Sequence, residues 1–143
     1  MKHGTLLVVD DNRNILTTVK MVMEQTFSRI VCIASPSGLM TRLREDKPDV
    51  VLLDMNFHSG INNGNEGLYW LREIKKSSPQ TAVVLFTAYA DIELAVTGLK
   101  DGAADFIVKP FDNAQLIEKL TAAYHKTHQQ KPSATSSAEM IWG

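Results

Sequence analysis

Five short apolar runs alternate with segments of helical periodicity along this chain, and this alternation is its most constraining feature. A strand followed by a helix, repeated five times, is typical of βαβ units and a parallel sheet. Because the runs are continuously apolar, helices are expected to cover both faces of the sheet. We therefore predict an α/β fold with a doubly wound, five-stranded parallel sheet and five helices. The predicted strands are Leu6–Val9, Val31–Ile33, Val50–Leu53, Val83–Phe86 and Phe106–Val108.

Capping residues and prolines mark the expected helix boundaries. The first helix is expected to follow Asn12, and the second to begin at Ser35-Pro36, a cap residue followed by proline. The second and third helices must end before Pro48 and Pro79. Apolar residues at helical spacing are Ile92, Ala95, Val96 and Leu99 in the fourth helix, and Leu116, Ile117 and Leu120, expected to be buried, in the fifth.

Polar side chains follow four of the five predicted strands. Asp10 and Asp11 come after the first, Asp54 after the third, Thr87 after the fourth and Lys109 after the fifth. In an open parallel sheet, ligands bind outside the carboxyl ends of the strands, so these side chains are expected to converge. Crowded carboxylates repel one another unless a divalent cation and a lysine compensate their charge. The sequence therefore predicts a site for a metal ion and a phosphoryl group.

Each of these residues also has an ordinary interpretation when it is taken alone. Asp10 or Asp11 can cap the first helix, and Asp54 can be a surface carboxylate. Thr87 can be a β-branched strand end, and Lys109 a solvated charge. As one set at four strand ends, in this order, they favour a functional site.

Composition and charge exclude several classes of protein. A net charge of −1 with no basic block argues against nucleic acid as a partner of this segment by itself. The single cysteine, Cys32, rules out an intramolecular disulfide framework and is expected to be a small buried residue. No apolar run approaches the roughly 18 residues of a membrane span, and no signal peptide is recognisable. These features predict a cytoplasmic protein.

The chain divides into one domain and a tail. Residues 1–126 carry the five strand–helix units, and residues 127–138 are rich in Gln, Ser, Thr and Ala, as in a linker. The apolar Met140-Ile141-Trp142 follows, so residues 127–143 are interpreted as a linker and the start of a truncated output domain. Within the domain, Phe57–Glu66 is a polar loop rich in asparagine and glycine.

The stretch from Leu6 to Tyr124 resembles the receiver domain of a two-component response regulator, through the strand-end residues described above. The resemblance implies a flavodoxin-like receiver fold with strand order 2-1-3-4-5. It also implies that Asp54 accepts a phosphoryl group from a phosphohistidine of a sensor histidine kinase. Mg²⁺ is then held by Asp10, Asp11, Asp54 and the backbone carbonyl of Asn56.

The resemblance assigns the switch to residues of the fourth and fifth strands. Thr87 is expected to hydrogen-bond the phosphoryl group, and Lys109 to form an ion pair with it. Phe106 is expected to turn inward when the domain switches, and the family uses a cis bond before the residue matching Pro110. The long loop departs from the family pattern: Gly67 matches the family's glycine with about five extra residues before it, and His58 stands where proline is common.

An enzyme class competes with this interpretation. Phosphatases of the haloacid-dehalogenase kind also form an aspartyl phosphate, but they need Asp-x-Asp after the first strand, and Asn12 occupies the second position. A mononucleotide-binding module is excluded because no glycine-rich phosphate loop follows the first strand. We therefore expect a regulatory module and not a metabolic enzyme.

The output of the predicted switch rests on resemblance alone. The long loop, the Thr87-Ala88-Tyr89 run and the serine-containing linker look similar to NtrC-type regulators, in which a sigma-54-activating ATPase and a DNA-binding domain follow the receiver. Binding to DNA would then occur only through the missing output domain, with homodimerisation on phosphorylation. A stand-alone receiver and a different output remain alternatives.

Two histidines late in the fifth helix stand apart from this set. His125 and His128 have a spacing that can hold a metal, but no Cys, Asp or Glu lies alongside them in the sequence. Favourable placement near the C-terminus of the helix is the better interpretation.

Overall fold

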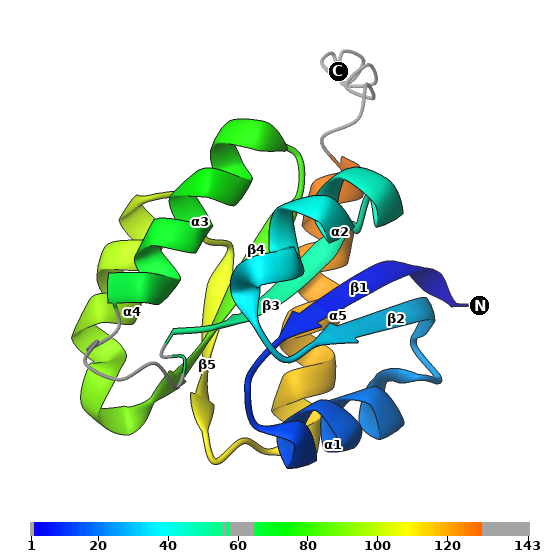
Figure 1. Cartoon of the computed structure of the whole chain (residues 1–143). Coiled ribbons are helices and arrows are strands. Elements are labelled where there is room, and N and C mark those ends of the chain that lie inside the picture. Colours follow the sequence, from blue (N-terminus) through cyan, green and yellow to red (C-terminus); the bar gives the residue numbers. More distant parts are fainter. Residues whose placement is uncertain (1, 56, 58–64, 130–143) are drawn as a thin grey trace, which may run out of the picture.

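A five-stranded parallel sheet forms the centre of the computed structural model, which describes residues 2–55, 57 and 65–129 (Figure 1). The strand order is β2-β1-β3-β4-β5. The predicted fold class and strand order are confirmed. The strands are β1 (His3–Val9), β2 (Phe27–Ile33), β3 (Val50–Asp54), β4 (Ala82–Ala88) and β5 (Asp105–Lys109).

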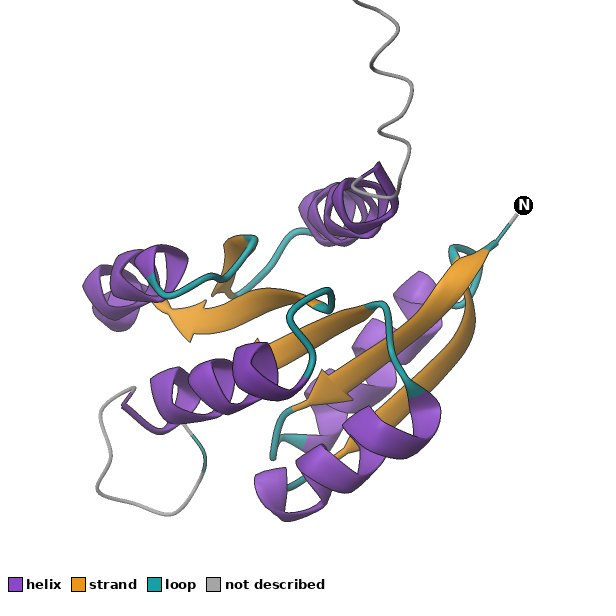
Figure 2. Ribbon diagram, turned by 90° about the horizontal axis from the view of Figure 1, so that it is seen from above, coloured by secondary structure: helices purple, strands orange, loops and turns teal. Residues whose placement is uncertain are grey.

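Five α-helices cover the two faces of the sheet (Figure 2). Buried residues of α1 and α5 pack with one face, and those of α2, α3 and α4 pack with the other. The helices are α1 (Arg13–Met23), α2 (Leu39–Asp46), α3 (Asn65–Ser77), α4 (Ile92–Lys100) and α5 (Asn113–Gln129).

The last four residues of strand β1 are all apolar because both faces of the sheet are covered there. Leu6 and Val8 belong to the core beneath α1 and α5, whereas Leu7 and Val9 belong to the core beneath α2, α3 and α4. All four side chains are fully buried. A strand covered on both faces has no solvent-facing position, so no polar residue alternates with the apolar ones.

Several predicted boundaries differ from the structure. In the structure, each strand extends beyond its predicted apolar run at one or both ends. The difference is clearest for β2, which begins at Phe27 and not at Val31. Ser35 does cap a turn, but that turn is the 3₁₀ segment Pro36–Gly38, and α2 begins only at Leu39. Helix α5 continues through Gln129, so residues 127–129 are helical and do not belong to the predicted linker. Residues 130–143 lie outside the described part of the chain.

Burial corrects two further expectations, for Ile117 and Cys32. Leu116 and Leu120 are buried as predicted, but Ile117 is 37% exposed. In α4, Val96 and Leu99 are also exposed, because Ala95 and Gly98 form the face that packs on the sheet. Cys32 is only partly buried, and this burial raises the pKa of its thiol. Among the described residues, no helix is both long enough and apolar enough to cross a membrane.

The contrast between Leu116 and Ile117 gives a direct test of helix α5 packing. Leu116→Ala is expected to lower the free energy of unfolding by about 2–5 kcal/mol, because it leaves a cavity in the core. Ile117→Ala is expected to lower it by about 1 kcal/mol or less, because the lost contacts are partly solvent-exposed. Urea denaturation of the two variants measures both values. Equal losses would contradict this orientation of α5.

Candidate functional site

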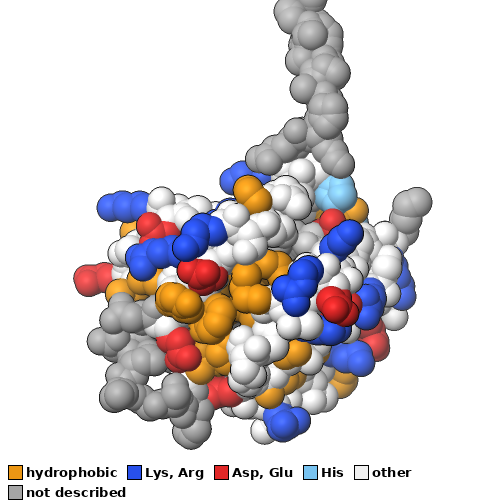
Figure 3. Space-filling model, turned by 45° about the horizontal axis from the view of Figure 1, so that its top comes forward, with side chains coloured by type: hydrophobic (Ala, Val, Ile, Leu, Met, Phe, Trp, Pro, Cys, Tyr) orange, Lys and Arg blue, Asp and Glu red, His pale blue; other side chains and the backbone are white. Residues whose placement is uncertain are grey.

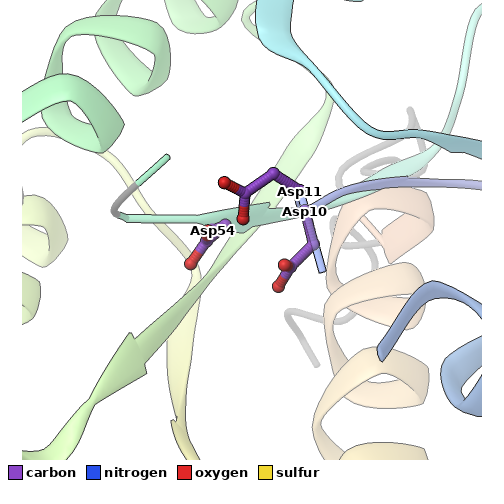
Figure 4. A group of neighbouring side chains, drawn as sticks. All are labelled: Asp10, Asp11 and Asp54. Carbon is purple, nitrogen blue, oxygen red and sulfur yellow. The ribbon is translucent and has the colours of Figure 1, made fainter. Parts of the chain in front are cut away.

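Three carboxyl groups meet where β1 and β3 end. Asp10 and Asp11 directly follow β1, and Asp54 is the last residue of β3. Each can offer an oxygen atom such that the three atoms lie within 4.8 Å of one another. Figure 4 shows the three side chains around one common space. The structure thus brings together residues that the sequence predicts to converge.

The backbone after β1 is shaped by Asp10 and Asn12. Asn12 caps α1, with its Oδ1 accepting from the backbone amides of Asn14 (2.9 Å) and Ile15 (3.3 Å). Oδ1 of Asp10 accepts from the amide of Asn12 at 2.9 Å. The alternative that an aspartate caps this helix is therefore wrong, since Asn12 performs that role.

Glycine at position 67 allows α3 to begin close to the end of β3. The amide of Gly67 donates to the carbonyl of Met55, the residue after Asp54, at 3.0 Å. A Cβ atom at Gly67 would lie 2.5 Å from the Cα atom of Met55, well inside van der Waals contact. Because that contact is with backbone, a side chain here would displace the start of α3 from the strand end that carries Asp54.

Lys109 joins the two buried carboxylates from the end of β5. Its Nζ donates to Oδ2 of Asp10 at 2.9 Å and to Oδ1 of Asp54 at 3.0 Å. Burial by itself lowers the pKa of this lysine, but the charges of Asp54 and Asp10 outweigh burial, so the pKa lies above its ordinary value of 10.5. Lys109 therefore carries its positive charge at neutral pH.

Carboxylates outnumber the ammonium group of Lys109 in this cluster. Among the described residues it brings three carboxyl groups and one lysine together, and two of the carboxyl groups are buried. Carboxylate oxygen is the ligand that Mg²⁺ prefers, usually together with retained water. Asp10, Asp11 and Asp54 thus fit a hard divalent cation by donor type, by proximity and by charge.

The other residues predicted for this site are found as follows. Thr87 is buried at the end of β4, beside the β3–β4 pairing of Asp54 with Phe86, and its hydroxyl donates to the carbonyl of Ala88 at 3.1 Å. Phe106 is partly buried, with Nζ of Lys119 5.4 Å from its ring centroid. The bond between Lys109 and Pro110 is cis. Asn56 and His58 lie outside the described residues.

One neighbour of the site carries no sequence signal. The ring of Phe86 lies beneath Lys109, with Nζ 4.8 Å from the ring centroid. Such a cation–π contact supports the position of the ammonium group. In the sequence Phe86 is one more apolar residue of a buried strand, so only the register of β4 against its neighbours could reveal it.

Comparison with known proteins identifies related domains. The family model described as "Response regulator receiver domain" matches residues 6–121. The transcriptional regulatory protein ZraR of Escherichia coli is 33% identical over 142 residues, which cover 96% of this chain and 31% of ZraR. The DNA-binding transcriptional regulator NtrC of Salmonella typhimurium is 30% identical, over 92% of this chain and 27% of NtrC. The chain thus spans less than a third of these curated relatives.

Two solved structures have the same fold. The N-terminal signal receiver domain of a two-component system response regulator from Bacteroides fragilis has a TM-score of 0.79 and 53% identity, covering 86% of this chain and 98% of that one. NtrX from Brucella abortus has a TM-score of 0.82 and 27% identity, covering 94% of this chain and 30% of NtrX.

The fit of the carboxylate group to a divalent cation can be measured as stabilisation. At a Mg²⁺ concentration ten times the dissociation constant, the free energy of unfolding is expected to rise by about 1.4 kcal/mol. Asp11→Ala is expected to retain less than about half of this gain at the same concentration, because one direct ligand is lost. Denaturation with and without Mg²⁺ provides the measurement.

Glu24→Ala supplies the matched control, because it removes an exposed carboxylate at the C-terminal end of α1, the end opposite to the one that follows Asp10 and Asp11. This variant should keep the full gain. An undiminished gain in Asp11→Ala would exclude Asp11 as a ligand and leave the role to the other two carboxylates.

Proposed function

Because the chain belongs to the response regulator receiver domain family, we propose that Asp54 accepts a phosphoryl group from the phosphohistidine of a sensor histidine kinase. The observation that carries this proposal is the juxtaposition of Asp10, Asp11 and Asp54, with Lys109 bonded to two of them. The domain would then act as a phosphorylation-controlled switch, and not as a metabolic enzyme.

In the proposed transfer, an Oδ atom of Asp54 forms a bond to phosphorus as the bond from phosphorus to the histidine nitrogen breaks. The electron pair of that broken bond stays on the imidazole. Phosphoryl transfer needs positioning and neutralisation of the equatorial oxygens more than covalent assistance. Lys109, already next to Asp54, can supply one of these positive charges.

Asp10, Asp11 and Asp54, together with the backbone carbonyl of Asn56, are the proposed holders of Mg²⁺. When bound, Mg²⁺ would offset the charge of the carboxylates and of the incoming phosphoryl group. Asp10 is held for this task by the amide of Asn12 and by Lys109, so its carboxyl group has little freedom to rotate. Such fixed ligand geometry lowers the cost of assembling the site.

The proposed switch runs from Thr87 to Phe106. Once Asp54 is phosphorylated, the hydroxyl of Thr87 would exchange its bond to Ala88 for one to the phosphoryl group. That movement would open space for the partly buried Phe106 to turn inward. A ligand shifts such an equilibrium only through its different interaction with the two states, and Thr87 and Lys109 would provide the difference.

Homodimerisation is the proposed consequence of the switch. Four exposed large apolar side chains lie on or next to α4 and α5. They are Tyr89 next to α4, Val96 and Leu99 on α4, and Ile117 on α5. Repacking of Phe106, on β5 between these helices, would change how these side chains meet a second copy.

The proposed output is activation of transcription. ZraR and NtrC are named as transcriptional regulators and are about three times longer than this chain by the coverage of the matches. By analogy we propose that this receiver controls a sigma-54-dependent output domain, which would supply DNA binding, and that it acts in the cytoplasm.

Asp54→Asn is expected to abolish phosphorylation by a small phosphodonor in the presence of Mg²⁺. The amide is nearly isosteric with the carboxylate but cannot attack phosphorus, so the fold is retained while labelling falls to background. Radiolabel incorporation, with circular dichroism as the folding control, measures this. Equal incorporation in both proteins would overturn the assignment of Asp54.

The same labelling experiment separates the competing enzyme class. Stable label on Asp54 supports the switch, whereas rapidly turned-over label on Asp10 would support a phosphatase of the haloacid-dehalogenase kind. Mass spectrometry of the labelled peptide identifies the site, since the two aspartates lie in different proteolytic fragments.

Thr87→Ala is expected to accept phosphate yet respond less to it. Without the hydroxyl, the phosphoryl group has one bond fewer in the active arrangement, so the shift toward that arrangement weakens. Sedimentation with and without beryllofluoride should show a mimic-dependent dimer in the wild type and a smaller dimer fraction in the variant. An identical oligomeric state with and without the mimic in the wild type would exclude this route.

A further inference from the structure

A cluster of aromatic and histidine rings lies at the edge of the sheet opposite the carboxylates, where β1 starts. The ring of His3 stacks on Tyr124, with centroids 4.4 Å apart and an interplanar angle of 25°. Tyr124 also contacts the ring of His128, at 4.1 Å. His125 meets His3 edge-on at 4.8 Å. The first strand and the last two turns of α5 are therefore joined by rings, three of which are imidazoles.

Asp49 ties this cluster to the sheet. Its Oδ2 accepts from the amide of Thr5 at 2.9 Å, and its Oδ1 lies 3.3 Å from Nε2 of His128, which must donate because a carboxylate only accepts. A Cβ atom at Gly4 would overlap the carboxyl group of Asp49, so the glycine permits this approach. The side chain of Asp49 thus bridges β1 and the C-terminal end of α5.

Protonation strengthens the contact of His128 with Asp49 but disfavours the contacts of His3. Protonation of His128 turns its bond with Asp49 into an ion pair. Protonation of His3 is opposed by its burial and by the nearby charges of His125, the chain's amino terminus and His128. The pKa of His3 is accordingly lowered from 6.5. The carboxylate bonded to this cluster is Asp49, which already accepts from His128 and from the amide of Thr5, and no carboxylate contributes to the pKa shift of His3.

We propose that His3, Tyr124, His125 and His128, with Asp49, form a pH-responsive clasp that fastens the C-terminal end of α5 to the start of the sheet. One positive charge, on His128, can be matched by Asp49. Further charge on His3 and His125 cannot be matched and pushes the rings apart. The end of α5 then loosens on acidification, by a route independent of phosphorylation.

The sign of the effect is set by the lowered pKa of His3. A folded state that binds a proton less strongly than the open state loses stability as the pH falls. The stability that neutral His3 contributes is therefore complete above pH 6.5, the ordinary pKa of histidine. It is lost as the pH drops through the lowered pKa of His3. Because an unperturbed histidine changes charge at about pH 6.5, the effect of His3 is expected below that value.

The location of the clasp lets it influence the segment after the domain. Helix α5 ends at Gln129, one residue beyond His128, and the chain continues from there. Figure 3 shows a histidine side chain exposed at the surface of the molecule. Loosening of the last two turns would change the direction in which the next segment leaves the domain.

The first test monitors the histidine ring protons of the full chain by NMR between about pH 5 and pH 8. His3→Phe and His58→Phe assign two of the four histidine signals. The proposal expects His3 to titrate below the ordinary value of 6.5, with a chemical shift change of Tyr124 at the same midpoint. Titration of His3 at or above that value overturns the proposal.

The second test measures amide hydrogen exchange along α5. Corrected for intrinsic rates, protection of residues 124–128 relative to Leu116 is expected to fall several-fold from about pH 7.5 to about pH 5, because the open state binds the His3 proton more strongly than the folded state. His3→Phe keeps a ring against Tyr124 without a titrating group, and it should remove most of this fall. His58→Phe, the matched control, should keep the fall unchanged.

Asp49→Asn completes the set. The amide oxygen can still accept from Thr5, but the charge that matches His128 is gone, so the loss of protection on acidification should become larger than in the wild type. Equal protection of the α5 end at both pH values in the wild type, or an unchanged fall in His3→Phe, overturns the clasp.

Discussion

The bridge from Lys109 to Asp10 and Asp54 is the interaction on which the functional edge of this domain depends. It connects β5 with β1 and β3, which are not adjacent to it in the sheet. Two buried carboxylates at that edge would repel each other without a compensating charge, and burial would strengthen the repulsion. The lysine therefore holds two of the carboxylates in an arrangement that fits a divalent cation. A phosphoryl group on Asp54, as proposed, would compete for the same ammonium group.

The sheet explains why residues distant in sequence meet in this way. All five strands run parallel, so every strand ends at the same edge, and register fixes how far each reaches. Asp54 pairs with Phe86, which places Thr87 one residue beyond it, and Val108 pairs with Thr87, which places Lys109 one residue further. The apolar runs that precede these residues thus build the core, and their register also sets how far each polar side chain extends beyond the edge of the sheet.

Much of this architecture could be predicted, because apolar strands and the polar residues at their ends are signals local in sequence. The fold class and the convergence of Asp10, Asp11, Asp54 and Lys109 needed nothing else, whereas the strand order was implied by the resemblance to receiver domains. The exposure of Ile117 could not be predicted, since helical spacing places it beside Leu116 and only the angle at which α5 packs separates them. The partners of His125 and His128 were missed for another reason. His3 and Asp49 lie far away in the sequence and meet them only through the fold.

Helix α5 extends from the edge of the sheet that carries the carboxylates and Lys109 to the edge that carries the histidine rings. Its first turn follows the β5 end that carries Lys109, and its last turns are held by the histidine rings. If the proposed phosphorylation switch and the proposed clasp both shift α5, they act on one equilibrium, and linkage then requires each to alter the other by the same free energy. A proton that loosens the end of α5 would change the affinity of the activated arrangement for its phosphoryl group, and phosphorylation would change the affinity of the rings for protons. The size of that coupling is limited by how rigidly α5 transmits motion along the face that packs on Leu116 and Leu120, which are both fully buried.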